Sequence, residues 1–531
     1  MLPAADTEVI RDLLAVCQHG AVPSPMPHRL DPTVLAGLRE AMAGHDYTVD
    51  AVLAAIGTTA HAALGRNSTV PAVRALTGRD DPLATLIRLW PLQRAVERSV
   101  AEAALPGLVE PLVAAGILTV DSAAGPQRVR AEVDLRPYAA DDRDLWVFSD
   151  LTPGLDTQVA PMRPDFVLGV SSASSTLAQL TIRRPVGSAL DLGTGCGVQT
   201  LHLADHAAAI TATDVNPRTL ELATLTLALN GVSAELLDGS LFEPVAGRRF
   251  DLVTTNPPYV MSPPRSGEER LAYRETGYRG DAMMEHLVRH AGDHLNPGGM
   301  CHILGNWAHL RGQPWQDRLA DWVSGTGLDV HIVQREVLDV PAYVELWLAD
   351  AGLAGSPEYR QRFVEWLDYF AGLGIEAVGM GWLLLTRAGR DDPWLRIEDW
   401  PYAVEQPIAP AFAAESDRIT ASRLPEADLL SHAWALTDDV IEETTGQPGA
   451  ADPQHIVLRQ QRGFRRAVEA DTALAAVLGA CDGELPLGVV IDAVAGLLEV
   501  DPLALRADLF PRLRTLIADG WFGLGDLRIE Q

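Results

Sequence analysis

The chain has 531 residues, too many for one hydrophobic core, so we expect about two to four domains. Its formal net charge is −29 and all 42 basic residues are arginine, a balance that repels nucleic-acid phosphates at long range and argues against RNA or DNA as a partner. The cysteines Cys17, Cys196, Cys301 and Cys481 are scattered, which excludes a disulfide framework and a paired-cysteine zinc site, and no metal is expected.

Residues 1–135 are expected to form an N-terminal helical domain. Met1–Asp6 lack the features of a signal peptide, and no apolar run is long enough to span a bilayer, so we expect a cytoplasmic protein without membrane contact. Apolar residues recur at helical spacing. The predicted helices are Thr7–Cys17, Asp31–Met42, Ala51–Ile56 and Asp81–Leu89.

From Asp80 onward the predicted order suits a winged helix. Two further helices, around Arg94–Ala104 and over Gly107–Ala115, precede two strands, Ile117–Val120 and Val129–Leu135. The helix that would enter a DNA groove, Pro106–Gly116, carries no basic residue. A substrate-docking or packing module is therefore favoured over DNA binding.

The stretch from Gly187 to Val260 carries the chemistry. The apolar run Ser188–Leu192 leads into Gly193-Thr194-Gly195-Cys196-Gly197 and then into a helical pattern over Val198–Ala204. A strand that turns through glycines into a helix brings backbone N–H groups close to a nucleotide-like ligand, although a lone pattern of this kind often marks only a turn. The predicted cofactor-binding residues here are Asp191, Gly193, Thr194, Gly195 and Gly197.

The next two predicted strands supply further candidate contacts. The strand Ala209–Thr213 ends in Asp214, at the spacing where dinucleotide-binding folds place the carboxylate that binds ribose hydroxyls. After a predicted helix, Pro217–Leu229, an apolar stretch around Leu236 leads to residues expected to line an adenine pocket. The predicted cofactor contacts from these strands are Asp214, Val215, Asn216, Asp238, Ser240 and Leu241.

The fourth predicted strand, Phe250–Thr255, ends in Asn256-Pro257-Pro258-Tyr259. With the glycine turn and Asp214 after the preceding strands, this tetrapeptide resembles the signature of the Asn-Pro-Pro-Tyr amino-methyltransferases, a group of class I S-adenosylmethionine-dependent methyltransferases. The resemblance covers about residues 161–304. It implies S-adenosyl-L-methionine as cofactor and an α/β, Rossmann-like core with a seven-stranded sheet over residues 136–390.

In that group the acceptor is a nitrogen on an sp² carbon, such as a glutamine amide, adenine N6 or guanine N2. Its lone pair is delocalised, so the site must accept the N–H bonds and align the lone pair with the sulfonium methyl. By resemblance, the Asn256 side-chain oxygen and the Pro257 carbonyl accept those hydrogens, Asn256 also borders the cofactor, and Tyr259 stacks on the planar group. Catalysis is then mostly positioning and preorganised electrostatics.

Two family resemblances compete for the acceptor. Arg163-Pro164-Asp165 partly resembles the Arg-Pro-Asp-Thr-Glu segment of the release-factor glutamine methyltransferases, with Phe166-Val167 in place of Thr-Glu. Residues 230–258 resemble the ribosomal RNA guanine-N2 methyltransferases about equally well. A glutamine-type and a guanine-type acceptor therefore both remain open from the resemblance alone.

The rest of the core is expected to shape the acceptor pocket. The loop Val260–Tyr278 carries Arg265, Glu268, Glu269, Arg270, Arg274 and Glu275, and is interpreted as a lid or substrate loop, or else as a solvated charged loop. Predicted strands Met300–Leu304, Leu328–Val333 and Val378–Thr386 complete the sheet. The aromatic helical region Val340–Gly374 is expected either to border the acceptor or simply to pack in the core.

Residues 391–531 are expected to hold a linker and a second winged-helix-like domain. Proline and acidic residues mark a linker-like connection from Asp391, with a further break at Ala450–Pro453. The predicted helices and the wing strand are Ala473–Cys481, Leu487–Leu498, Pro502–Ala518 and Trp521–Leu524.

The leading hypothesis is an enzyme that methylates a glutamine or asparagine side-chain amide of a protein or peptide. The Asn-Pro-Pro-Tyr loop, the Arg-Pro-Asp segment, the run Leu241–Pro244 and the acidic balance favour it. The alternatives are an RNA base-amino methyltransferase acting on guanine N2 or adenine N6, a small-molecule N-methyltransferase, and a non-catalytic methyltransferase-like regulator. The intact glycines, Asp214 and Asn256 argue against loss of catalysis.

Overall fold

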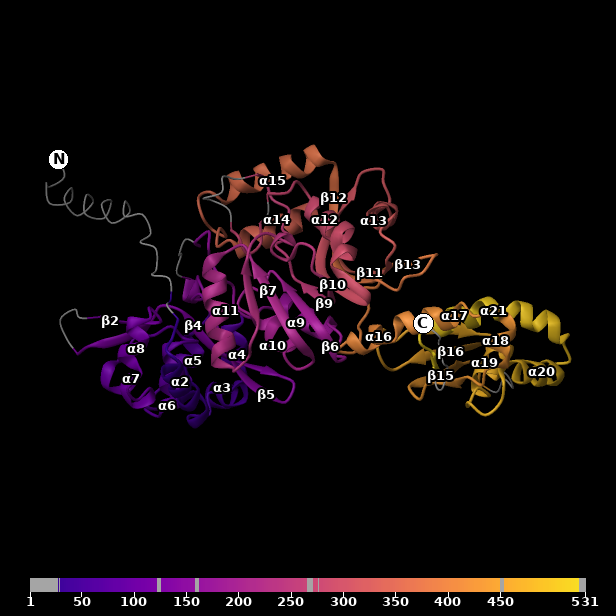
Figure 1. Cartoon of the computed structure of the whole chain (residues 1–531), viewed down its shortest axis with the longest axis horizontal. Helices are drawn as coiled ribbons and strands as arrows, with labels where there is room; N and C mark the ends of the chain where they lie inside the picture. Colours follow the sequence, from indigo (N-terminus) through magenta and orange to yellow (C-terminus); the bar gives the residue numbers. More distant parts are fainter. Residues whose placement is uncertain are drawn as a thin grey trace.

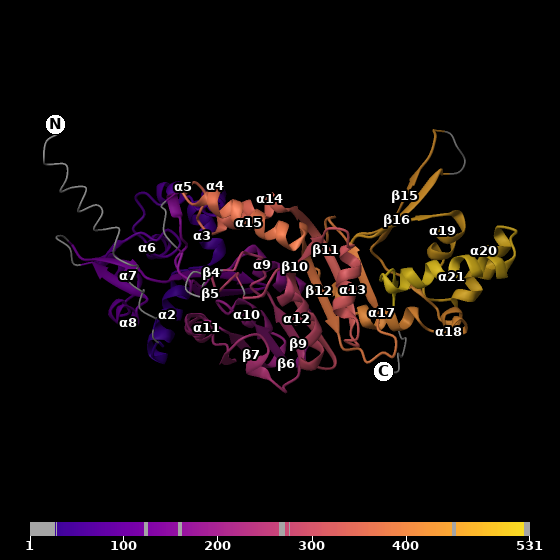
Figure 2. The same ribbon diagram turned by 90° about the horizontal axis from the view of Figure 1, so that it is seen from above.

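A computed structural model describes residues 27, 29–121, 126–157, 162–264, 271–275, 277–448 and 453–524. The predicted helix Thr7–Cys17 and the loop residues 265–270 lie outside the described residues. An N-terminal module, a central sheet domain and a C-terminal module follow one another along the long axis (Figure 1), and the same order is visible from above (Figure 2). No helix in the described ranges is long and apolar enough to cross a membrane.

The N-terminal module is helical with one small antiparallel sheet. Its helices begin where side chains cap them: Asp31 accepts from the Thr33 N–H at the start of α2, and Asp81 caps α6 in the same way. The three short strands pair in the order β1-β3-β2. The elements are α2 (Pro32–Gly44), α3 (Val49–Ile56), α4 (Thr58–Leu64), α5 (Val70–Ala75), α6 (Pro82–Leu89), β1 (Val96–Glu97), α7 (Arg98–Ala104), α8 (Val109–Ala114), β2 (Leu118–Asp121) and β3 (Arg128–Ala131).

A β-hairpin, β4 (Asp134–Ala140) and β5 (Arg143–Ser149), joins this module to the central domain. The Trp146 indole N–H donates to the Tyr47 carbonyl, and the Phe148 backbone N–H donates to the Thr226 hydroxyl of α11 (Pro217–Leu229). One hydrophobic cluster includes residues of the module, of the hairpin and of α11. A division at residue 135 therefore cuts through a shared core.

The central domain is an eight-stranded sheet among the described residues, in the order β13-β11-β12-β10-β9-β6-β7-β8. The five strands from β10 to β8 run parallel, and β12 runs antiparallel to both its neighbours. The strands are β6 (Val186–Leu192), β7 (Ala207–Asp214), β8 (Glu235–Asp238), β9 (Phe250–Thr255), β10 (Leu295–Leu310), β11 (Asp329–Asp339), β12 (Ile375–Thr386) and β13 (Leu395–Asp399). The seven predicted strands are present.

The sheet has one strand more than predicted. β13 lies beyond the expected boundary at residue 390 and pairs with β11 in parallel, in a stretch interpreted from its sequence as a linker. α12 (Ala282–Ala291) and α13 (Trp315–Val323) pack in one hydrophobic cluster, and α9 (Ser172–Leu180) and α10 (Val198–Leu203) contribute to others. Short 3₁₀ turns occur at Leu155–Thr157, Glu243–Val245 and Gly292–His294.

Two helices, α14 (Val340–Asp350) and α15 (Tyr359–Leu373), are inserted between β11 and β12, as the aromatic helical pattern predicts. They pack through Tyr343, Trp366 and Phe370, all fully buried. The Tyr343 hydroxyl accepts from the Met261 backbone N–H. The insertion thereby contacts the loop that follows Asn256-Pro257-Pro258-Tyr259.

The C-terminal module contains the predicted helices and more structure than the sequence suggested. Its helices α19 to α21 match the predicted ones, and the predicted wing strand β18 pairs with a short β14. The supposed linker instead folds into helices and a three-stranded antiparallel sheet. The elements are α16 (Ala409–Ala413), α17 (Glu415–Ser422), α18 (Glu426–Ser431), β14 (Ala435–Leu436), β15 (Val440–Thr445), β16 (His455–Gln460), β17 (Ala467–Ala470), α19 (Thr472–Gly479), α20 (Leu487–Leu497), α21 (Pro502–Ala518) and β18 (Phe522–Gly523).

Candidate active site

The glycine turn after β6 is held in place by its own neighbours. Gly193, Gly195 and Gly197 have φ angles of 78°, 56° and 86°, a region that residues with a Cβ rarely adopt. The backbone N–H groups of Gly193 and Thr194 both donate to the Thr213 carbonyl of β7 at 2.9 Å. The turn is therefore tied to the neighbouring strand before any ligand binds.

Asp191 holds the glycine turn through hydrogen bonds from two threonine hydroxyls. Its side chain is 1% exposed, and one carboxylate oxygen accepts from the hydroxyls of Thr194 and Thr200, each at 2.7 Å. Burial raises the pKa of this carboxyl group, and the threonine hydrogen bonds oppose that shift. Asp191 thus acts through the turn and has no place in the cavity wall.

Asp214 ends β7 and faces the same turn. One carboxylate oxygen accepts from the Gly195 N–H at 3.1 Å and the other from the Asn216 N–H at 2.9 Å. Burial raises the pKa of the Asp214 carboxyl group to about 6, although both backbone hydrogen bonds lower it. Asp214 lies three residues before the first residue of α11, in the wall of the cavity described next.

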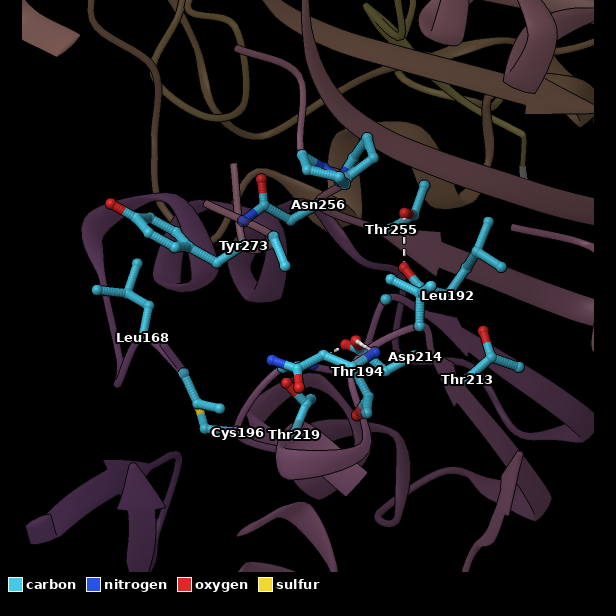
Figure 3. Close-up of a pocket in the computed structure, with 18 of the residues that line it drawn as sticks. Leu168, Leu192, Thr194, Cys196, Thr213, Asp214, Thr219, Thr255, Asn256 and Tyr273 are labelled. Atoms are coloured by element: carbon cyan, nitrogen blue, oxygen red, sulfur yellow. Dashed lines mark hydrogen bonds between the residues drawn. The ribbon is translucent and has the colours of Figure 1, made fainter. Parts of the chain in front are cut away.

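A cavity of about 530 Å³ opens at the carboxyl ends of β6, β7 and β9, where α/β sheets bind their ligands (Figure 3). The charged side chains in its described wall are all acidic, since no arginine or histidine lines it and the chain has no lysine. The lining residues are Pro164–Gly169, Ser171, Ser174, Leu192–Cys196, Val198, Gln199, Thr213–Pro217, Thr219, Gly239–Leu241, Thr255–Pro258, Ala272, Tyr273, Glu275, Gly277, Tyr278 and Met283.

Asn256 faces this cavity with an unused acceptor. The Thr255 hydroxyl, one residue earlier, donates to the Leu192 carbonyl at 2.7 Å and ties the end of β9 to the glycine turn (Figure 3). The Asn256 side-chain oxygen is buried and has no hydrogen-bond partner among the described residues. A buried polar atom without a partner is costly, so the geometry is suited to a ligand that brings an N–H or O–H donor.

The Arg-Pro-Asp segment contributes Pro164 and Asp165 to the cavity wall. The Asp165 carbonyl accepts from the Asn216 side-chain amide at 3.0 Å, and the Pro164 carbonyl accepts from the Ala272 N–H at 3.0 Å. Behind it, Arg218 and Asp150 form a buried ion pair. The segment is therefore anchored to both α11 and the substrate loop.

The next part of the wall, beside the Arg-Pro-Asp segment, comes from Ala272, Tyr273 and Glu275. Val260 and Glu275 are bridged in parallel, and the Arg274 guanidinium donates to Asp350 of α14 and to the Trp347 carbonyl, each at 2.8 Å. Arg274 and Glu275 are each 3% exposed, so the solvated-loop interpretation is wrong for these two residues. Arg265, Glu268, Glu269 and Arg270 lie outside the described residues.

The structure gathers most of the sequence-predicted site residues around this cavity. Those in its wall are Gly193, Thr194, Gly195, Asp214, Val215, Asn216, Ser240, Leu241, Asn256 and Pro257. Four are not in the wall: Asp191 and Gly197 support the turn, Asp238 is exposed at the end of an edge strand, and the Tyr259 ring meets Trp347 edge-on at 6.3 Å. The stacking role of Tyr259 and the cofactor contact of Asp238 stay predictions for residues that lie outside the described cavity wall.

Sequence reasoning missed Tyr273 and gave Glu275 no specific role. The Tyr273 ring lies edge-on to Phe166 at 5.7 Å, and its hydroxyl donates to Asp350 at 2.7 Å. Tyr273 and Asn256 both line the cavity (Figure 3). No local motif marks Tyr273, because Asp350 of α14, 77 positions further along the chain, holds its hydroxyl. Glu275 is held by near neighbours, since its backbone N–H donates to the Leu271 carbonyl at 2.9 Å, but no motif marks it either.

Two protein families match parts of this chain. Residues 169–321 match the family described as "Methyltransferase small domain", and residues 44–132 match "Domain of unknown function (DUF7059)". The chain therefore contains an S-adenosylmethionine-dependent methyltransferase domain. In the described ranges, no cluster of three or more histidine, cysteine or acidic side chains could hold a metal ion.

Curated relatives of two kinds match this domain. A release factor glutamine methyltransferase of Geobacter sulfurreducens is 31% identical over 157 residues, covering 28% of this chain and 54% of the relative. The ribosomal RNA small subunit methyltransferase C of Alcanivorax borkumensis is 30% identical over 120 residues, covering 23% of this chain and 32% of the relative. The chain thus spans about half the length, or less, of these relatives.

Solved methyltransferase structures match this chain at low identity and low TM-score. A Pyrococcus furiosus methyltransferase is 18% identical with a TM-score of 0.24, and the match covers 41% of this chain and 83% of that one. A T. thermophilus 16S rRNA N2 G1207 methyltransferase, in complex with AdoMet and guanosine, is 17% identical with a TM-score of 0.26 and covers 42% of this chain and 56% of that one.

Proposed function

We propose that this chain transfers the methyl group of S-adenosylmethionine to the side-chain amide nitrogen of a glutamine or asparagine in a protein or peptide. The observation that carries the proposal is the buried side-chain oxygen of Asn256, which has no partner among the described residues and lies in a cavity wall whose described residues include no basic side chain. An amide NH₂ supplies the donor that this oxygen lacks.

The cavity residues fit the cofactor. Its volume of about 530 Å³ lies in the range of small-molecule sites, and the glycine turn, Asp214 and the backbone of Gly239–Leu241 surround one half of it. Asp214 would accept from the ribose hydroxyls, and the acidic wall suits a sulfonium cation. The bound cofactor supplies an electrophilic methyl group.

The chain's own residues position the acceptor. Asn256 accepts one amide N–H through its side-chain oxygen, and the Pro257 carbonyl takes the other. Both come from a loop that the Thr255–Leu192 hydrogen bond fixes against the glycine turn, so the nitrogen lone pair is directed to the cofactor side. The Phe166 and Tyr273 rings exclude water from this half of the cavity.

RNA base-amino methylation is the second candidate, favoured by the similarity to the ribosomal RNA methyltransferases. It would require the acidic chain to bind phosphates outside the described cavity wall. In either case we propose that the end modules, which we interpret as winged-helix-like, dock the acceptor. A small-molecule amine is the third candidate.

The test is transfer of radiolabelled methyl from S-adenosylmethionine into host-cell extract, followed by protease or ribonuclease digestion, with the Asn256→Ala variant as the background control. Label that protease releases supports the proposal. Label that ribonuclease releases overturns it in favour of RNA, and label confined to small molecules overturns both macromolecular candidates.

A further inference from the structure

Glu275 is a buried carboxylate that makes only long hydrogen bonds. It lies in the part of the cavity wall that we call the acceptor half, formed by Asn256, Pro257, Tyr273 and Glu275. Its side chain is 1% exposed, yet it lies in the cavity wall with Asn256. One oxygen is 3.3 Å from an Arg274 guanidinium nitrogen, and the other is 3.4 Å from the Leu271 backbone nitrogen. Both distances exceed the usual 2.7–3.2 Å for an N–H···O hydrogen bond.

Arg274 is engaged elsewhere. Its Nη1 donates to Asp350 and to the Trp347 carbonyl at 2.8 Å, so the stronger contacts of the guanidinium go to α14. The group Arg274, Glu275 and Asp350 carries two carboxylates for one cation. Asp350 also accepts from the Tyr273 hydroxyl, which leaves Glu275 as the carboxylate with the poorer set of donors.

Asp214, in the cofactor half, is also largely buried, and its two oxygens accept backbone N–H groups at 2.9 and 3.1 Å. A buried carboxylate normally has such partners, because the free energy of removing it from water is large. The different bonding of Glu275 indicates that a bound molecule completes its hydrogen bonds.

We propose that Glu275 is an acceptor-binding residue that takes a second N–H donor of the methyl acceptor, next to the nitrogen held by Asn256. This rests on the proposed function for the kind of acceptor. In a peptide the second donor is a backbone N–H beside the glutamine or asparagine. Asn256 and Glu275 then accept hydrogen bonds from two N–H donors of one molecule. A planar group with an acceptor atom beside its amino nitrogen, such as adenine, is disfavoured, because that acceptor atom would face the Glu275 carboxylate without a hydrogen between them.

The test compares Glu275→Gln with wild type and with Glu285→Gln as the matched control. Glu285 lies on α12 outside the cavity wall and pairs with Arg289, so the same chemical change is made without touching the site. Each protein is saturated with S-adenosylhomocysteine and titrated by calorimetry with the peptide acetyl-Ala-Gln-Ala-amide and, separately, with guanosine. Glu275→Asp is the second variant, because it keeps the charge and shortens the reach.

We expect Glu275→Gln to bind S-adenosylhomocysteine within about twofold of wild type and the peptide at least about tenfold more weakly. Glu285→Gln should match wild type, and Glu275→Asp should recover part of the loss. With labelled cofactor, Glu275→Gln should raise KM for the peptide more than it lowers kcat, as expected for a group that binds the acceptor.

The outcomes separate this inference from the proposed function. Equal peptide binding by wild type and Glu275→Gln overturns the role of Glu275 alone, and so does a loss confined to S-adenosylhomocysteine. If wild type binds guanosine but not the peptide, and Glu275→Gln no longer binds guanosine, the result supports Glu275 as an acceptor-binding residue and overturns the proposed methylation of an amide. If wild type binds neither probe, both proposals fail.

Discussion

The two halves of the cavity are built differently. In the cofactor half, the glycine turn, Asp191 and Asp214 satisfy one another through hydrogen bonds of 2.7–3.1 Å. In the acceptor half, the Asn256 side-chain oxygen has no partner among the described residues and the Glu275 carboxylate has only long contacts.

The difference indicates which half of the cavity has its polar groups hydrogen-bonded before a ligand binds. Satisfied polar groups keep their geometry without a ligand, so the cofactor half is preorganised for one common cofactor. Unsatisfied acceptors are tolerated where a ligand completes them. The acceptor half therefore carries the specificity of this chain, and it is also the half that lies against the inserted helices α14 and α15.

The largest expected effect comes from Asn256→Ala. Removing one preorganised polar contact to the reacting group typically costs about 10²–10³ in kcat, and here the contact is the one that orients the nitrogen. Cofactor affinity should stay nearly unchanged, because the cofactor half keeps all of its own hydrogen bonds. Single-turnover methyl transfer and calorimetric cofactor binding measure the two effects; equal losses of both would show that Asn256 belongs to the cofactor half.

Asp214→Ala should act in the opposite half. Loss of a hydrogen bond to a charged group costs about 1.5–3 kcal/mol, which corresponds to roughly 10–100-fold weaker cofactor binding. Asp238→Ala is the matched control, since Asp238 is the register partner of Asp214 on β8 but is exposed outside the cavity wall. Unchanged affinity in Asp214→Ala, or an equal loss in the control, would remove Asp214 from the ribose site.

Cofactor binding should weaken as the pH falls through about 6, where the Asp214 carboxylate of the free protein takes up a proton. The ionised form accepts from ribose hydroxyls, so each pH unit below this pKa should cost up to about tenfold in affinity. For folding the sign is reversed: because the pKa of Asp214 in the folded protein lies above the ordinary value of 3.8, its contribution to stability is lost as the pH rises through about 6. Titrations with S-adenosylhomocysteine between about pH 5 and 8 would contradict this if affinity stayed constant.

The smallest effect is expected for Tyr259→Phe. The Tyr259 ring contacts Trp347 and lies outside the cavity wall, and burial raises the pKa of its hydroxyl to about 12, so the group stays neutral. Since the ring is retained, kcat should stay within about twofold of wild type. A large loss of kcat at unchanged thermal stability would show that the Tyr259 hydroxyl binds the acceptor directly. The acceptor half would then extend beyond the described cavity wall.

The sequence predicts the cofactor half well because its signals are local. Glycines that follow a strand, and an aspartate at the end of the next one, have a fixed meaning in a parallel sheet. The acceptor half escapes prediction because Tyr273 and Arg274 are positioned through Asp350, far along the chain, and no local motif marks Glu275. Likewise, the proline and acidic residues after Asp391 led to the prediction of a linker where β13 forms. The place of β13 in the sheet is fixed by its pairing with β11.

The core shared by the N-terminal module and α11 has a consequence for folding cooperativity. Asp214 ends β7 three residues before α11 begins, whereas the Arg39 guanidinium donates to the carbonyls of Ala228 and Leu229 at the last turn of α11. Cofactor bound at one end of this helix thus lowers the free energy of a folded unit that includes the module at the other end. Backbone amides of α2, which the cavity does not touch, should exchange with deuterium more slowly once the cofactor is bound.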